Sequence, residues 1–121
     1  MWIFTKNGFV SAVRKNAHPD VLTIRARDKE SLAELIDLTG AELAKSPDGD
    51  YPYRIFVKPD VFAQWLSTSA LDIDYDNFKS KVAKVRGNAF TASLHNVWSA
   101  MLNVEDEDAR DGEAHYVDPN N

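Results

Sequence analysis

Residues 72–102 read DIDYDNFKSKVAKVRGNAFTASLHNVWSAML and decide the fold. Phe78, Val82 and Val85 recur at helical spacing, which predicts a helix that Asp74 caps and that ends at Gly87. A second, longer helix is predicted to follow. Its apolar residues recur at three- and four-residue steps, and they are Phe90, Leu94, Val97, Trp98 and Met101. We expect this helix pair to cover the strands that precede it in the chain.

Residues 2–14, at the other end of the domain, are predicted to form a β-hairpin. Asn7-Gly8 is a favoured pair for a two-residue type I′ turn, because both residues accept positive φ. This turn would place Trp2 opposite Val13. One face of the hairpin would then carry Trp2, Phe4, Phe9 and Val13. The other face would carry Ile3, Thr5, Val10 and Ala12. Both faces are apolar, so one must meet the helices, and the other is either covered as well or available to a partner.

The segment between these two regions supplies more strands and helices. Residues 21–27 alternate, which directs Leu22, Ile24 and Ala26 inward and Thr23, Arg25 and Arg27 to solvent. A helix capped by Asp28 and ending at Gly40, a loop over 41–52, a strand over 53–58 and a helix opened by Pro59 are predicted next. The order predicts an α+β fold, with an antiparallel or mixed sheet of about four strands and helices packed mainly on one face.

Composition and charge predict one folded domain with an acidic tail. The 121 residues are 44% hydrophobic and include no cysteine, which excludes disulfides, thiolate metal ligands and cysteine nucleophiles. The chain has 14 basic and 19 acidic residues. Segment 105–121 contains one of the basic and seven of the acidic residues, so residues 1–104 carry a net charge of only +1. We expect residues 1–104 to form a single compact domain and 105–121 a flexible tail. No membrane span or signal peptide is recognisable, so a cytoplasmic location is expected.

Patterns typical of metal, cofactor or catalytic sites are weak. Asp72, Asp74 and Asp76 have the alternation of cation-binding loops, but no glycine and no later glutamate stand at the spacing of a calcium loop. Acidic residues at a helix start are expected for capping alone. We therefore predict no metal, no cofactor and no catalytic residue. An enzyme alternative would use Asp74, Tyr75 and His95.

A nucleic-acid alternative would use the sheet. Arg25 and Arg27 lie on a predicted strand, and the hairpin aromatics Trp2, Phe4 and Phe9 could stack on bases. The small net charge of residues 1–104 weighs against this alternative, because nucleic-acid affinity depends on many phosphate contacts. The same aromatics are also what a small core requires.

Five segments in order resemble a family of small uncharacterised proteins of bacteria and their phages. They are MWIFTKNGFVS (1–11), IRARD (24–28), DYPYR (50–54), IDYDNFK (73–79) and HNVWSAM (95–101). The resemblance implies a free-standing cytoplasmic domain and a phage origin, and it implies no activity.

The polar residues of these segments could converge at one end of the sheet, where Asp74 would pair with an arginine. With the hairpin aromatics, the candidate binding residues are Trp2, Phe9, Arg25, Arg27, Tyr53, Asp74, Tyr75, Asn77, Lys79 and His95. The leading hypothesis is a non-catalytic module that binds or regulates a protein partner. A phage-encoded modulator of a host protein is a special case of it.

Overall fold

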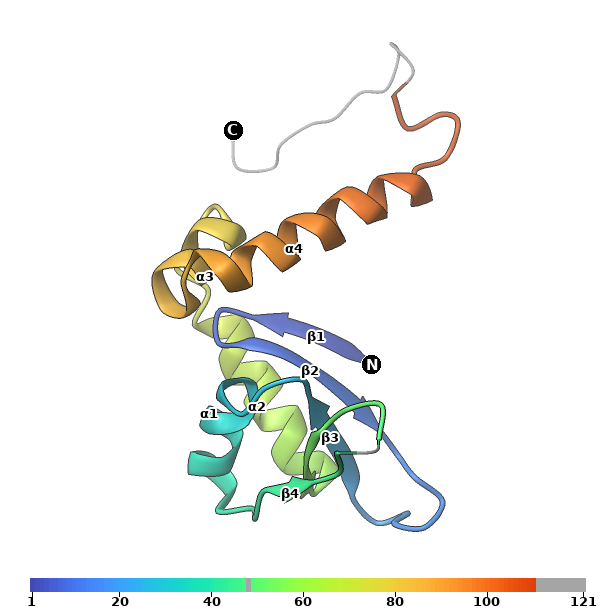
Figure 1. Ribbon diagram of the computed structural model, residues 1–121, viewed down its shortest axis with the longest axis vertical. Helices are drawn as coiled ribbons and strands as arrows, with labels where there is room; N and C mark the ends of the chain where they lie inside the picture. Colours follow the sequence, from blue (N-terminus) through green and yellow to red (C-terminus); the bar gives the residue numbers. More distant parts are fainter. Residues whose placement is uncertain (48, 111–121) are drawn as a thin grey trace.

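The computed structural model describes residues 1–47 and 49–110, which form a five-stranded antiparallel sheet with four α-helices (Figure 1). The strands are β1 (Trp2–Thr5), β2 (Gly8–Val13), β3 (Leu22–Ala26), β4 (Ala44–Lys45) and β5 (Tyr53–Val57), in the spatial order β1-β2-β3-β5-β4. The helices are α1 (Glu30–Thr39), α2 (Pro59–Leu71), α3 (Phe78–Arg86) and α4 (Asn88–Met101), which a 3₁₀ turn extends over Leu102–Val104. The predicted α+β class and N-terminal hairpin are confirmed.

The fifth strand, β4, lies where the sequence predicted only a loop. Ala44 pairs with Arg54 and Lys45 with Tyr53, so β4 forms one edge of the sheet. With two residues it is too short for a pattern of alternating side chains to reveal it.

The hairpin register differs from the predicted one. Lys6 and Asn7 form the turn, Thr5 pairs with Gly8, and Trp2 pairs with Ser11 instead of Val13. Asn7 does not supply the positive φ of a type I′ turn, since no non-glycine residue in the described chain has one. The register is shifted by two residues, and because side chains alternate with a period of two, the two predicted faces are preserved.

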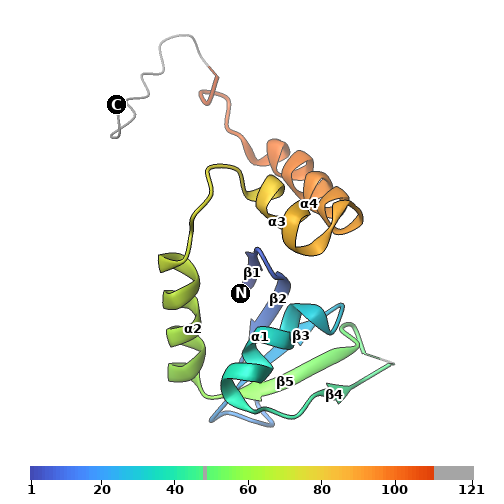
Figure 2. The same ribbon diagram turned by 90° about the vertical axis from the view of Figure 1, so that its left-hand side faces the viewer.

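The core lies between the sheet and helices α1 and α2, which pack on one face (Figure 2). It consists of Val10, Ala12, Ile24, Ala26, Leu32, Leu35, Ile55, Val57, Phe62 and Trp65. Thr23 was predicted to face solvent but is buried, because it lies between its pairing partners Val13 and Phe56 on the opposite face. That opposite face therefore has a covered region of its own.

Helix α3 begins later than predicted. Asn77, and not Asp74, is the N-cap, and its Oδ1 accepts a hydrogen bond of 2.9 Å from the backbone N–H of Ser80. Asp74 lies in the linker before the helix and pairs with Lys81 at 3.1 Å. Both residues are of a capping type, and the chain uses the one directly before the first helical turn.

Arg86, at the end of α3, attaches the helix to the sheet and to α1. Its Nη1 donates to the backbone oxygen of Asn7 at 2.7 Å, and its Nη2 donates to Asp28. Glu30 Oε2 lies 2.9 Å from its Nε, and its guanidinium stacks 4.2 Å above the ring centroid of Phe90. The arginine side chain is almost fully buried by these contacts.

Helix α4 covers the sheet only with its first half, contrary to the expected lid. Leu94 is buried and Phe90 half-buried, while Val97, Trp98 and Met101 are 41%, 53% and 57% exposed. Figure 1 shows the second half of the helix extending past the sheet. Helix α3 is shorter than α4, with 9 residues against 14, so among the described residues it does not cover the whole length of α4.

No helix within the described parts of the chain has the length and apolar character needed to cross a membrane. Of the predicted tail, residues 105–110 are exposed, and Arg110 pairs with Glu105 at 2.7 Å. The prediction for 111–121 lies outside the described residues.

Candidate functional site

A groove of about 430 Å³ lies between the face of the hairpin that α1 and α2 leave open and the first half of α4. We call it the sheet groove. Its sheet side includes Trp2, Phe4, Phe9, Arg27 and Tyr51, and its helix side includes Phe90, Leu94 and Val97. It brings together three of the predicted binding residues, Trp2, Phe9 and Arg27.

The aromatic part of the sheet groove is built by cross-strand packing. Phe4 and Phe9 pair directly and stack with ring centroids 4.6 Å apart. Trp2 packs edge-on against Phe9 at 5.8 Å and remains 70% exposed. Phe9 therefore holds both neighbours in place, and Trp2 presents most of its indole to solvent.

The polar part of the sheet groove is centred on Tyr51, which is almost fully buried. Arg27, which lines the groove, and Arg25, which lies behind its lining, stack their guanidinium groups on this ring at 4.3 and 4.6 Å from its centroid. Arg25 also donates to the Ser11 hydroxyl at 2.8 Å, while Arg27 reaches the backbone and carboxylate oxygens of Asp50. Among the described residues, no carboxylate lies within 4.0 Å of Arg25.

A second groove, of about 600 Å³, lies between the linker, α3 and α4. We call it the helix groove. Its lining residues are Phe4, Tyr75, Asp76, Asn77, Phe78, Lys79, Leu94, Val97 and Trp98. His95 adjoins it, with its Nδ1 3.4 Å from Lys79 Nζ and its ring stacked 5.5 Å from that of Trp98.

The candidate residues are not gathered in one site: six line one of the two grooves, His95 adjoins the helix groove, and Arg25, Tyr53 and Asp74 line neither. Tyr75, Asn77, Lys79 and His95 belong to the helix groove, and they come together because α3 and α4 pack side by side. Tyr53 lies on neither groove, because strand alternation turns it to the core face, where it packs against the core. Phe4, Leu94 and Val97 line both grooves, but this junction was not apparent from the sequence.

The predicted pairing of Asp74 with an arginine is wrong, because Asp74 bonds Lys81 instead. The hydrogen bond from Lys81 lowers the pKa of the Asp74 carboxyl below its ordinary value of 3.8. A carboxylate with a lowered pKa stays ionised at neutral pH, whereas a general base works best with a pKa near the operating pH. The geometry around Asp74 therefore favours an ion pair on the surface over acid–base chemistry.

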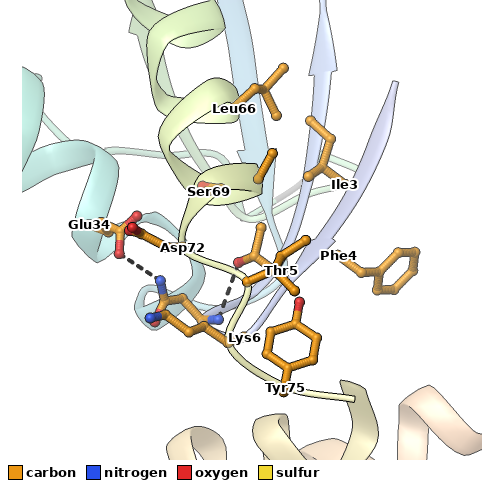
Figure 3. A pocket seen from close by; sticks show the side chains of 12 residues that line it. Ile3, Phe4, Thr5, Lys6, Glu34, Leu66, Ser69, Asp72 and Tyr75 are labelled. Carbon is orange, nitrogen blue, oxygen red and sulfur yellow. Dashed lines mark hydrogen bonds between the residues drawn. The ribbon is translucent and has the colours of Figure 1, made fainter. Parts of the chain in front are cut away.

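A third, smaller pocket of about 190 Å³ lies between β1 and the end of α2 (Figure 3). One of its polar groups is the Glu34 carboxylate, which accepts hydrogen bonds of 2.7 Å from Asn7 Nδ2 and from Trp65 Nε1. Both bonds tie α1 to neighbouring elements, so Glu34 has a structural role here. Within residues 1–47 and 49–110, no cluster of three or more histidine, aspartate or glutamate side chains could hold a metal ion.

No family model, no curated protein and no solved structure matches the chain. The family resemblance therefore stays a prediction, and function has to be argued from the two grooves.

Proposed function

We propose that this protein is a non-catalytic binding module whose sheet groove holds a segment of a partner protein. The partner segment would place an apolar side chain against Trp2 and Phe9 and an acidic group against Arg27, with Arg25 adding positive charge behind the groove. The observation that carries the proposal is the position of an exposed indole next to arginine side chains held in place by Tyr51.

The aromatic residues supply the affinity in this proposal. Exposed tryptophan in a groove is the kind of side chain that dominates protein interfaces, because it buries a large apolar area with few rotatable bonds. Trp2 is held by Phe9, so little additional ordering would accompany binding.

The arginines supply the selectivity for acidic partners. A guanidinium fixed on an aromatic ring is oriented for paired hydrogen bonds to a carboxylate. The pairing of Arg27 with Asp50 is 3.4 Å long and exposed, so it is worth little and can exchange for a ligand carboxylate. If the chain is of phage origin, as the resemblance implies, the segment would belong to a host protein.

Selection from a random peptide library tests the proposal. Enriched peptides should combine an aromatic or large aliphatic residue with aspartate or glutamate. Trp2→Ala should weaken their binding by about 1–3 kcal/mol, and Arg27→Glu should weaken it further at low salt. Leu38→Ala, an exposed apolar change on α1, and Lys58→Glu, a charge reversal before α2, are the matched controls. Equal binding by Trp2→Ala and the native chain would refute the assignment.

A nucleic acid is the second candidate for this groove, because bases can stack on Trp2 and Phe9 while arginines bind phosphates. Fluorescence anisotropy with single-stranded oligonucleotides separates the two. Nucleic-acid binding should weaken steeply as salt is raised, since each phosphate contact releases counterions. Peptide binding that rests on Trp2 should retain most of its affinity in the same titration.

A further inference from the structure

Helix α4 and its 3₁₀ extension carry no formal charge. Residues 87–104 include no lysine, arginine, aspartate or glutamate, and His95 is the one titratable side chain among them. The end of this segment is nevertheless exposed. The exposed fractions are 41% for Val97, 53% for Trp98, 57% for Met101, 42% for Leu102 and 69% for Val104.

A surface helix in contact with water usually carries charged residues on its outer side. An uncharged helix with a contiguous apolar end is typical of an interface. From this pattern we infer that a second copy of this chain packs on the outer face of α4, defined by Val97, Trp98, Met101 and Leu102, and forms a two-fold symmetric dimer.

Charge favours a second copy over an unrelated partner. A two-fold axis places a surface against its own copy, so a charged surface meets like charge. Helices α1 and α3 would meet this repulsion, because α1 carries Glu30, Glu34 and Asp37, and α3 carries Lys79, Lys81 and Lys84. Among the described α-helices, α4 is the one that carries no fixed charge, whereas α2 carries Asp60.

The segments that flank the helix are complementary in an antiparallel pair. If two copies of α4 cross near Met101, the residues after Met101 on one copy lie beside Trp98 of the other. Segment 105–108 consists of four acidic residues, and Lys79 lies over Trp98 with its Nζ 4.7 Å from the ring centroid. Each acidic segment would then lie beside the Lys79 ammonium of the second copy.

The helix groove gives the inserted side chains a place to bind. It lies along α4 at Val97 and Trp98, and its floor includes Phe4, Phe78 and Leu94. Met101 of the second copy is suited to fill such a groove, because its unbranched thioether chain adapts to irregular apolar surfaces. The inference goes beyond the proposed function and does not depend on it. Phe4, Leu94 and Val97 border both grooves, but Trp98 and Met101 do not line the sheet groove.

Sedimentation velocity of the full chain over a range of concentrations tests the inference. The native chain should sediment as a concentration-dependent dimer. Trp98→Glu and Met101→Glu should each raise the dimer dissociation constant by roughly 30-fold or more, as expected for central interface residues. Leu38→Glu places the same charge at an equally exposed apolar position on α1 and should leave the dimer dissociation constant unchanged. Circular dichroism confirms that each variant is folded.

A cross-linking experiment tests the antiparallel arrangement. The chain has no cysteine, so a single introduced thiol can form a disulfide only with another copy. Met101→Cys, near the proposed axis, should oxidise rapidly to a covalent dimer, and Leu38→Cys should not. A native chain that stays monomeric at every concentration, or a dimer that Trp98→Glu leaves intact, would overturn the inference. Loss of peptide binding by Trp2→Ala in a chain that still dimerises would concern the sheet groove alone.

Discussion

Gly8 is a position where only glycine fits. Its φ is +146°, and a Cβ added there would lie 2.2 Å from Ser31 Oγ and 2.6 Å from Arg86 Nη1. We predict that Gly8→Ala lowers the free energy of unfolding by roughly 2–4 kcal/mol, through backbone strain and overpacking together. Urea unfolding measures the effect.

Gly40 offers the matched control for Gly8. It also has positive φ, +69°, as the residue that ends α1, but no atom lies within 4 Å of an added Cβ. Gly40→Ala should therefore show the conformational cost alone, about 1 kcal/mol. Similar losses for the two variants would contradict the close approach of Ser31 and Arg86 to the hairpin.

Asp28 links stability to pH. Burial alone would raise the pKa of its carboxyl, but hydrogen bonds from Ser31 and Arg86 outweigh this and hold the pKa below the ordinary value of 3.8. A carboxyl with a lowered folded-state pKa stabilises the fold above its unfolded pKa, and this contribution is lost as the pH falls through the folded-state value. The native chain should lose stability below about pH 4.

Asp28→Asn should be less stable at neutral pH by about 1–2 kcal/mol, because the buried Arg86 loses a charged partner that is itself partly exposed. It should also lose less stability on acidification than the native chain. Urea midpoints measured between about pH 6 and pH 2 give both quantities. An unchanged acid profile would show that the ion pair does not contribute.

For the hairpin residues, the sequence predicted which side chains share a face of the sheet but not which residues pair across the two strands. Alternation along the hairpin is local, so Trp2, Phe4 and Phe9 were placed together correctly. The register depends on Gly8, which is crowded by residues far away in the chain. The role of Tyr51 under two arginines depends on contacts between a loop and β3, which no local pattern reveals.

Helix α3 is attached to the rest of the protein by the buried side chain of Val82 and by the ion pairs of Arg86. Val82 is fully buried, whereas Val85 on the same helix is 46% exposed. Val82→Ala should destabilise the protein by about 2 kcal/mol, and Val85→Ala by less than about 0.5 kcal/mol. Hydrogen exchange should report faster exchange in α3 and α4 for Val82→Ala. Equal effects of the two substitutions would show that α3 is packed differently.

Periodicity predicted each helix but not its surroundings. The three- and four-residue spacing in α4 identified an apolar face, and a helix formed there. The same spacing is satisfied whether that face meets the sheet or a second molecule, and the structure leaves half of it exposed. The cap of α3 was misplaced for a similar reason, since Asp74 and Asn77 have equivalent capping chemistry.

For the whole molecule, the charge distribution makes a testable difference to binding. Removing residues 105–121 changes the net charge from −5 to +1. A chain that ends at Val104 should therefore associate faster with acidic peptides at low ionic strength. Stopped-flow kinetics should show the difference disappear at about 0.5 M salt, where charges are screened beyond a few ångströms. A rate that is unaffected by the truncation at low salt would mean that the acidic residues lie far from the sheet groove.

The α+β architecture followed from the order of the predicted strands and helices. The purely antiparallel sheet did not, because the sequence left the direction of the strand predicted over 53–58 open. The two grooves could not be foreseen at all, since both depend on where α4 crosses the hairpin.

The hydrogen bond between Arg86 and Asn7 joins residues 79 positions apart. All five strands and both core helices are complete at Leu71, so the sheet can form before the α3–α4 pair has left the ribosome. The α3–α4 pair is less buried than the sheet and its two core helices, so it should be the first unit to open in the folded protein. In a nascent chain, the aromatic face of the hairpin would therefore be exposed to solvent and to other proteins before α4 packs beside it.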